Sequence, residues 1–251
     1  MGHSVGDQST WCARLEELLP VETINMGMGG YGIGQAWLWY KRERGMYRHQ
    51  VQLFCFIAED FRRMPMSNLR GYGKPVLKVV DGKLAVTNTP VPKTSYLTSS
   101  LIRNAEQLEA LHSVKLMRKL GSEQTATDKS ILNVCRKVFL ELKEWHAQNG
   151  SLLVLVYIPR MYDYGQMSPY RKFVARFAAE NDISFIDVTP AIDRLTAGQA
   201  IRLYEGHFNE EGNSLVAETI RDGLKNLPAF TQRLSGFKSS QKDSSIQKRN
   251  P

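Results

Sequence analysis

The sequence predicts an α/β protein built on a parallel sheet, and two patterns carry this prediction. Three continuous apolar runs, typical of strands buried on both faces, occupy residues 51–60, 151–159 and 183–190. Helical periodicity follows them over 128–148 and 168–182, and again from about Glu210. Strands that alternate with helices favour a parallel sheet, whose ligands bind at the carboxyl ends of the strands.

The N-terminal part adds a helix, a strand and a glycine-rich turn. Residues 9–19 begin with Ser9 or Thr10 as the cap and keep their apolar residues on one helical face. Residues 21–25 predict a buried strand, and a glycine run from Gly27 to Gly34 then leads into an amphipathic helix. Such a turn can offer backbone N–H groups to an anion or oxyanion, or it can be a plain tight turn. A dinucleotide site is disfavoured because no acidic residue follows at the required spacing of about 20 positions.

The middle of the chain predicts an insertion over about 62–127 in a single domain of residues 1–228. Residues 74–88 alternate around Asp81-Gly82, which predicts a β-hairpin. Helical periodicity predicts a helix over 101–120. The insertion therefore combines a hairpin with a helix.

Charge and composition favour a globular domain and argue against nucleic-acid binding and a membrane span. The chain has 251 residues, of which 42% are hydrophobic, as expected for one globular domain. Half of the net charge of +8 lies from Ala229 onward, where a Ser/Gln/Lys-rich composition predicts a disordered tail over 229–251. The remaining charge is ordinary, so we expect no nucleic-acid partner. No apolar run reaches about 18 residues, so no membrane-spanning helix is predicted.

Cysteine usage predicts no metal site and no disulfide framework. Cys12, Cys55 and Cys135 are odd in number and widely spaced, and the last two lie in apolar patterns typical of buried residues. No signal peptide begins at Met1. This favours a cytoplasmic protein if Met1 is the true start, and leaves an upstream signal or anchor open if it is not.

His207 is the strongest candidate for acid–base chemistry. It lies in the glycine-bearing loop EGHFNEEG, two residues after Glu205. A histidine held by a carboxylate is the usual general base for a Ser or Cys nucleophile, although a histidine in an exposed loop can also be without function. We expect His49, His112 and His146 to be structural or solvated.

With these blocks in this order, the chain resembles the SGNH/GDSL hydrolase superfamily from about Gly2 to Leu227. The resemblance is carried by INMGMGGYGIGQ, FIAEDF and EGHFNEEGNSLVAE, which look like the second, third and final sequence blocks of the family. It implies a flavodoxin-like three-layer α/β/α fold and ester hydrolysis by a Ser nucleophile, a His base and an oxyanion hole. It also implies a small-molecule or glycan ester as substrate, without a cofactor or metal.

The resemblance assigns catalytic roles residue by residue. Gly30 would donate its N–H to the oxyanion, His207 would be the base, and Glu205 would orient it where relatives use Asp. Glu59 stands where the third block has Asn, and a carboxylate cannot donate a hydrogen bond to an oxyanion. The loss of one such donor costs roughly 10²–10³ in rate. The residues expected to bind substrate are Asn25, Gly29, Asp60 and Asn209.

The family's first block, with its GDS nucleophile, has no counterpart in this sequence. Matching residues 1–19 to the end of that block places the nucleophile three residues before Met1. Asp7 is no substitute because Gln8 stands where Ser is needed, and Ser4 and Ser9 are candidates only by proximity. Either the start was assigned too late or the gene is truncated. The first strand of the sheet, between 21–25 and 51–57, would then be missing, and its neighbours would expose unpaired edges.

Two functions remain open on these grounds. The first is an ester hydrolase acting on O-acyl groups of a glycan, a lipid or a small ester. The second is a catalytically inactive SGNH-like domain that binds a ligand or partner, or a truncated remnant. For the enzyme, we predict that Gly30, Glu59 and His207 converge at the carboxyl edge of the sheet, around a gap that a Ser side chain would fill.

Overall fold

The computed structural model describes residues 5–19, 21–69, 71–92, 124–163 and 168–234. The chain divides into two compact units. The first unit consists of Met1–Gly27, Arg48–Ile57 and Lys143–Pro251, and the second of Met28–Tyr47 and Ala58–Leu142. The predicted helix over 101–120, part of the predicted insertion and residues 235–251 of the predicted tail lie outside the described residues.

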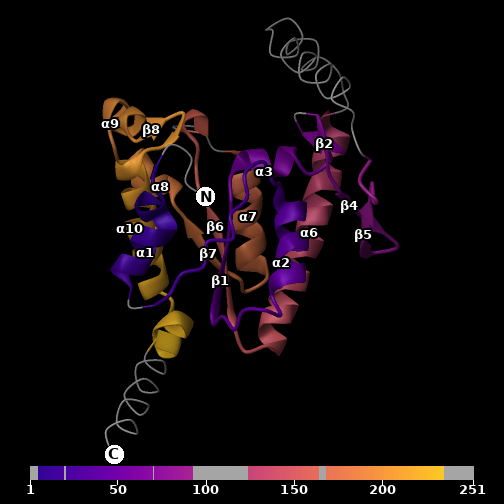
Figure 1. Cartoon of the computed structure of the whole chain (residues 1–251), viewed down its shortest axis with the longest axis horizontal. Helices are drawn as coiled ribbons and strands as arrows, with labels where there is room; N and C mark the ends of the chain where they lie inside the picture. Colours follow the sequence, from indigo (N-terminus) through magenta and orange to yellow (C-terminus); the bar gives the residue numbers. More distant parts are fainter. Residues whose placement is uncertain (1–4, 20, 70, 93–123, 164–167, 235–251) are drawn as a thin grey trace, which may run out of the picture. The chain divides into compact units, whose positions relative to one another are not determined.

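The first unit contains the parallel sheet (Figure 1). Its three strands lie in the order β1 (Val51–Phe56), β6 (Leu152–Tyr157) and β7 (Ser184–Asp187). Both pairs are parallel, with Val51 opposite Leu152 and Val154 opposite Ser184. The α/β class and the parallel pairing of the three apolar runs are therefore confirmed.

One face of this sheet packs against helices α1 (Trp11–Leu18) and α10 (Glu210–Lys225), which lie side by side. Alternate residues of β6 and β7 point to this face and are almost fully buried there, together with Leu15 of α1 and Val216 and Ile220 of α10. The other helices of the first unit are α7 (Pro169–Glu180), α8 (Thr189–Asp193) and α9 (Ala197–Arg202), with short 3₁₀ turns at η1 (Asp7–Ser9) and η2 (Met161–Asp163).

The predicted strand over 21–25 is wrong: in the described part of the chain this segment forms no strand and takes no part in the parallel sheet. Thr23 instead bonds to α1, because its N–H donates to the Glu16 carboxylate at 2.7 Å and its hydroxyl lies 2.9 Å from the Cys12 carbonyl. Ile24 is half exposed. A strand needs a neighbour that accepts its backbone hydrogen bonds, and the sheet described here places none beside this segment.

The boundary of the predicted disordered tail also needs correction. Residues 228–234 are helical, and Phe230 is buried in the core of the first unit. The Arg233 guanidinium donates to the Gly150 carbonyl at 3.1 Å, and Leu234 packs against the same core. Burial of Phe230 holds this segment against the core, although most of its neighbours in the sequence are polar.

The second unit contains the glycine turn and the hairpin. Its elements are α2 (Ile33–Glu43), α3 (Ala58–Arg62), β2 (Asn68–Leu69), β3 (Tyr72–Gly73), β4 (Val76–Val80), β5 (Lys83–Thr87) and the part of α6 (Gln124–Gln148) that ends at Leu142. Asp81 and Gly82 both have positive φ, of 49° and 73°, as a two-residue hairpin turn requires. The predicted hairpin and the predicted helix over 128–148 are confirmed.

Two of the histidines are structural, as predicted. His146 is buried, with Nδ1 2.6 Å from the Ser151 hydroxyl and Nε2 2.7 Å from the Gln52 side-chain oxygen. The His49 ring stacks on Trp145 at 5.5 Å. These contacts join the end of α6 to the starts of β1 and β6, whereas His112 lies outside the described residues.

The described residues were also compared with the predictions for membrane-spanning helices, metal sites and disulfides. None of their helices is long and apolar enough to cross a membrane, and none of their His, Cys, Asp and Glu side chains form a group of three or more placed to hold a metal ion. Cys12, Cys55 and Cys135 are free thiols. Burial raises the pKa of all three, to about 11 for Cys12, so they behave as inert small apolar groups.

A buried lysine organises the second unit around α3. Lys74 is only 4% exposed, and its ammonium group donates to the Arg63 carbonyl just beyond the end of α3. Asn88 donates to the Lys74 carbonyl at 2.7 Å. Burial and the Arg63 charge lower the pKa of Lys74 to about 8, although the nearby Asp60 carboxylate acts in the opposite direction.

This pKa predicts that stability rises with pH. Between about pH 8 and the ordinary lysine pKa of 10.5, the unfolded chain binds a proton at Lys74 that the folded chain has lost, so folding is favoured as pH increases. We expect wild type to gain on the order of 2 kcal/mol over Lys74→Met between pH 7 and pH 10, measured by urea denaturation. Parallel pH profiles for the two proteins would contradict this account.

Candidate functional site

His207 lies on a small hairpin of the first unit, formed by β8 (Tyr204–Glu205) and β9 (His207–Phe208). Gly206 makes the turn with a φ of 77°. Glu205 pairs with His207 in the hairpin register, and residues directly opposite in an antiparallel pair have their side chains on the same face. Both residues are exposed. The hairpin therefore sets Glu205 opposite His207 in the backbone register, and the predicted role of Glu205 in orienting the imidazole stays a prediction.

Two contacts brace this hairpin. The Tyr204 ring stacks on Phe208 at 4.3 Å, and the Tyr204 hydroxyl reaches the Pro159 carbonyl, just after β6, at 3.4 Å. Burial, assisted by the nearby Asp163 carboxylate, raises the pKa of Tyr204, which keeps the phenol protonated as a donor. The Asn209 N–H closes the hairpin by donating to the Leu203 carbonyl at 2.9 Å.

Asn209 is the N-cap of α10. Its side-chain oxygen accepts from the Gly212 N–H at 3.0 Å, and its side-chain nitrogen donates to the Arg202 carbonyl at 2.7 Å. An N-cap of this type typically stabilises a helix by about 1 kcal/mol. The structure thus gives Asn209 a capping role, and its predicted role in substrate binding stays a prediction.

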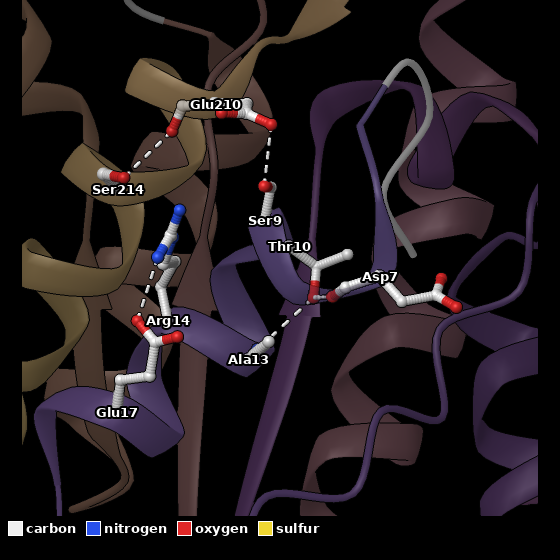
Figure 2. Close-up of polar contacts among 8 residues, drawn as sticks. All are labelled: Asp7, Ser9, Thr10, Ala13, Arg14, Glu17, Glu210 and Ser214. Atoms are coloured by element: carbon white, nitrogen blue, oxygen red, sulfur yellow. Dashed lines mark hydrogen bonds and ion pairs between the residues drawn. The ribbon is translucent and has the colours of Figure 1, made fainter.

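The segment before α1 is attached to the helix that follows His207. Figure 2 shows Ser9 and Thr10 at the start of α1 and Glu210 at the start of α10. The Ser9 hydroxyl donates to the Glu210 carboxylate at 2.8 Å, and the Trp11 N–H donates to the Asn213 side-chain oxygen at 3.0 Å. Ser9, a candidate nucleophile only by proximity, is thus engaged by a carboxylate. Ser4 lies outside the described residues.

The glycine turn packs closely against α3 and β2 in the second unit. Gly30 has a φ of 79°, and a Cβ there would lie 2.9 Å from the Leu69 side chain. A Cβ on Gly32 would lie 2.7 Å from the Asp60 carbonyl. Gly30 is therefore favoured by its left-handed backbone conformation, and Gly32 by the close approach of a backbone carbonyl, without any need for a catalytic role. The helix α2 that follows has no side-chain cap hydrogen bond at its N-terminus.

The two acidic residues of the predicted third block form ion pairs within α3 and just after it. Glu59 lies 3.2 Å from Arg62, and Asp60 lies 2.9 Å from Arg63. Arg63 also donates to the Tyr31 carbonyl at 3.4 Å, so Asp60 holds the glycine turn through this arginine. The ion pair of Glu59 uses its carboxylate form, which can only accept hydrogen bonds.

The predicted site residues fall into both units. The first unit brings Glu205, His207 and Asn209 together on one hairpin and also contains Asn25, whose side chain accepts from the Gly27 N–H at 3.0 Å. The second unit contains the remaining predicted residues, which are Gly29, Gly30, Glu59 and Asp60. Convergence of the two groups around a serine stays a prediction.

A separate groove of about 380 Å³ runs along β7 in the first unit. Phe185 and Asp187 of β7, Arg194 and the end of α10 line it. None of the predicted site residues contributes to this groove. It is therefore not the site indicated by the sequence.

Asn213 and Tyr204 are the residues that the sequence interpretation missed. Asn213 shares the buried stripe of α10 with Val216, Ala217, Ile220 and Leu224, so a polar residue on an apolar helical face was the available signal. Nothing in the sequence pattern around Tyr204 indicates a bracing role.

In comparisons with protein-family models and with curated proteins, nothing matches this chain.

Packing at Gly212 gives a direct test of the hairpin geometry. A Cβ there would collide with the Phe208 ring and lie 2.5 Å from the Leu203 carbonyl, which the backbone holds in place. We expect Gly212→Ala to destabilise the protein by about 2 kcal/mol in urea denaturation, because overpacking must displace the hairpin. Gly198→Ala, in α9 with open space around the added methyl, is the control and should be neutral or slightly stabilising. If the two substitutions changed the free energy of unfolding equally, the hairpin would be able to shift away from the added methyl group without cost.

Proposed function

We propose that this chain is an SGNH/GDSL-type ester hydrolase domain in which His207 is the general base and Glu205 orients it. The observation that carries the proposal is the hairpin, whose register sets Glu205 opposite His207 and whose Tyr204 stacks on Phe208 and bonds to the Pro159 carbonyl. The parallel sheet gives the proposal its structural setting, because loops at the carboxyl ends of such strands carry active sites.

The proposed nucleophile is a serine supplied by the segment that precedes Met1. Support comes from the start of α1, where Ser9 and Trp11 bond to Glu210 and Asn213. Both partners lie in the first turn of α10, which begins three residues after His207. A chain that enters through these contacts passes close to the base.

The reaction then follows the usual serine-ester sequence. The serine oxygen adds to the ester carbonyl carbon while its proton passes to His207. The tetrahedral oxyanion collapses, the bond to the alcohol oxygen breaks, and the alcohol leaves with the proton from His207. Water repeats the cycle on the acyl-enzyme, releasing the acid. Glu205 stabilises the imidazolium in both halves, and the Gly30 N–H is the proposed donor to the oxyanion.

The proposed substrate is an O-acyl ester of a glycan, a lipid or a small alcohol. This class rests on the resemblance of the sequence blocks and on the exposed position of His207. An exposed base suits an ester carried on a larger molecule, because the acyl group can approach without entering a deep cavity.

A second candidate function is an inactive domain of the same lineage that binds a ligand. The observation in its favour is Glu59, whose ion-paired carboxylate stands where the family supplies a hydrogen-bond donor. A negative charge there would repel the oxyanion.

Hydrolysis of a short aryl ester separates the two functions. We expect no turnover by the 251-residue chain, and turnover once the chain is extended by upstream codons that encode a GDS segment. His207→Ala in the extended chain should reduce the rate to background, whereas Glu59→Asn should raise it about tenfold or more by adding a donor and removing a charge.

Three outcomes would count against this proposal. Turnover by the 251-residue chain that disappears in His207→Ala would mean that the nucleophile lies within these residues. An extended chain without turnover would favour the inactive binding domain. Full activity of His207→Ala would remove the histidine from the mechanism.

A further inference from the structure

Asn213 has a buried side chain whose hydrogen-bonding capacity is used on three backbone groups. It is 4% exposed and lies in the first turn of α10. Its nitrogen donates to the carbonyls of Phe208 and Asn209, at 3.0 and 2.9 Å, and its oxygen accepts from the Trp11 N–H at 3.0 Å. A buried amide with both donors and its acceptor paired is a fixed point in a structure, because any shift leaves a polar group unsatisfied.

The three bonds join two segments that are about 200 residues apart in the chain. Trp11 is the first residue of α1, and its N–H has no partner within its own helix. Thr10 caps the same helix by accepting from the Ala13 N–H at 3.3 Å, so Asn213 and Thr10 satisfy different amides of one helix start. The carbonyl of Phe208 belongs to the residue directly after His207.

We propose that Asn213 is a positioning residue for His207, an inference that rests on the proposed function. Its carboxamide fixes the backbone on the C-terminal side of His207 and, through Trp11, the start of the helix into which the preceding segment leads. The base and the incoming segment therefore share one anchor. The Ser9–Glu210 bond is a second link between the same segments, but it is exposed and easily replaced by water.

A positioning role and a purely stabilising role predict that different parts of the structure loosen when Asn213 is substituted. A residue that only stabilises the fold would, when changed, loosen α10, α1 and the sheet together. A positioning residue would loosen the hairpin first, because the Asn209 N–H bond to Leu203 depends on the backbone that Asn213 holds. The matched substitution is Asn213→Asp, which keeps an acceptor for Trp11 but places an oxygen against two carbonyls.

The test is residue-resolved amide hydrogen exchange on the 251-residue chain, combined with NMR of the histidine imidazoles. In Asn213→Asp we expect the Asn209 amide to exchange at least tenfold faster than in wild type, with a smaller change at Val154 and Val156 in β6. The His207 imidazole signals should shift while those of His49 and His146 stay in place. Thr219→Val is the control, because Thr219 bonds only to its own helix at Leu215 and should leave both readouts unchanged.

Two results would overturn the proposal: equal acceleration at Asn209 and in β6, or an unmoved His207 signal in a folded variant. If Asn213→Asp does not fold, Asn213→Ala removes all three hydrogen bonds of the side chain without introducing a charge and must meet the same criteria. Neither readout involves turnover, so a protein that hydrolyses no ester could still position His207 through Asn213. Failure here is thus distinct from failure of the proposed function.

Discussion

The packing of α10 against the parallel sheet is the constraint on which the first unit depends. Val216, Ile220 and Leu224 are fully buried against the apolar face of β6 and β7. At Gly223 the helix approaches so closely that a Cβ would lie 2.9 Å from Ile186. Because α10 begins three residues after His207, the same contact that closes the core also determines where the histidine hairpin stands. Fold and candidate chemistry are thus joined through one helix.

Polar side chains then fix the junctions between the packed elements by bonding to their backbone groups. In the first unit, Asn209 and Asn213 satisfy the backbone groups at the junction of hairpin, α10 and α1. In the second unit, the ion pair of Asp60 with Arg63 and the buried Lys74 do the same around the glycine turn. Backbone conformation at Gly30 and close packing at Gly32 explain these two glycines, so their presence is compatible with an oxyanion site without demanding one.

Much of the fold could be predicted because continuous apolar runs and helical periodicity are local signals. The strands at 51–56, 152–157 and 184–187 were found in this way. The strand predicted over 21–25 does not form, because strand formation depends on a partner and the pattern of a segment does not reveal whether one exists. Phe230 was hidden by its polar neighbours, although Leu227, Phe230 and Leu234 follow helical spacing.

The candidate site was predictable only in part. His207 and Glu205 could be singled out from a short loop with a carboxylate near a histidine, and the hairpin register places them opposite each other. Asn213 could not be assigned a role from its position alone, since its three partners come from segments at both ends of the chain. Glu59 was recognised as a departure from the family pattern, and its ion pair with Arg62 explains how its charge is accommodated.

Covalent labelling would show whether a serine outside these 251 residues works with His207, as proposed. The chain extended upstream would be treated with a fluorophosphonate, which reacts with activated serines, and the adduct located by peptide mass spectrometry. We expect one adduct, on the serine three positions before Met1, and its loss in His207→Ala. An adduct on a serine within the 251 residues, or labelling that persists in His207→Ala, would contradict it.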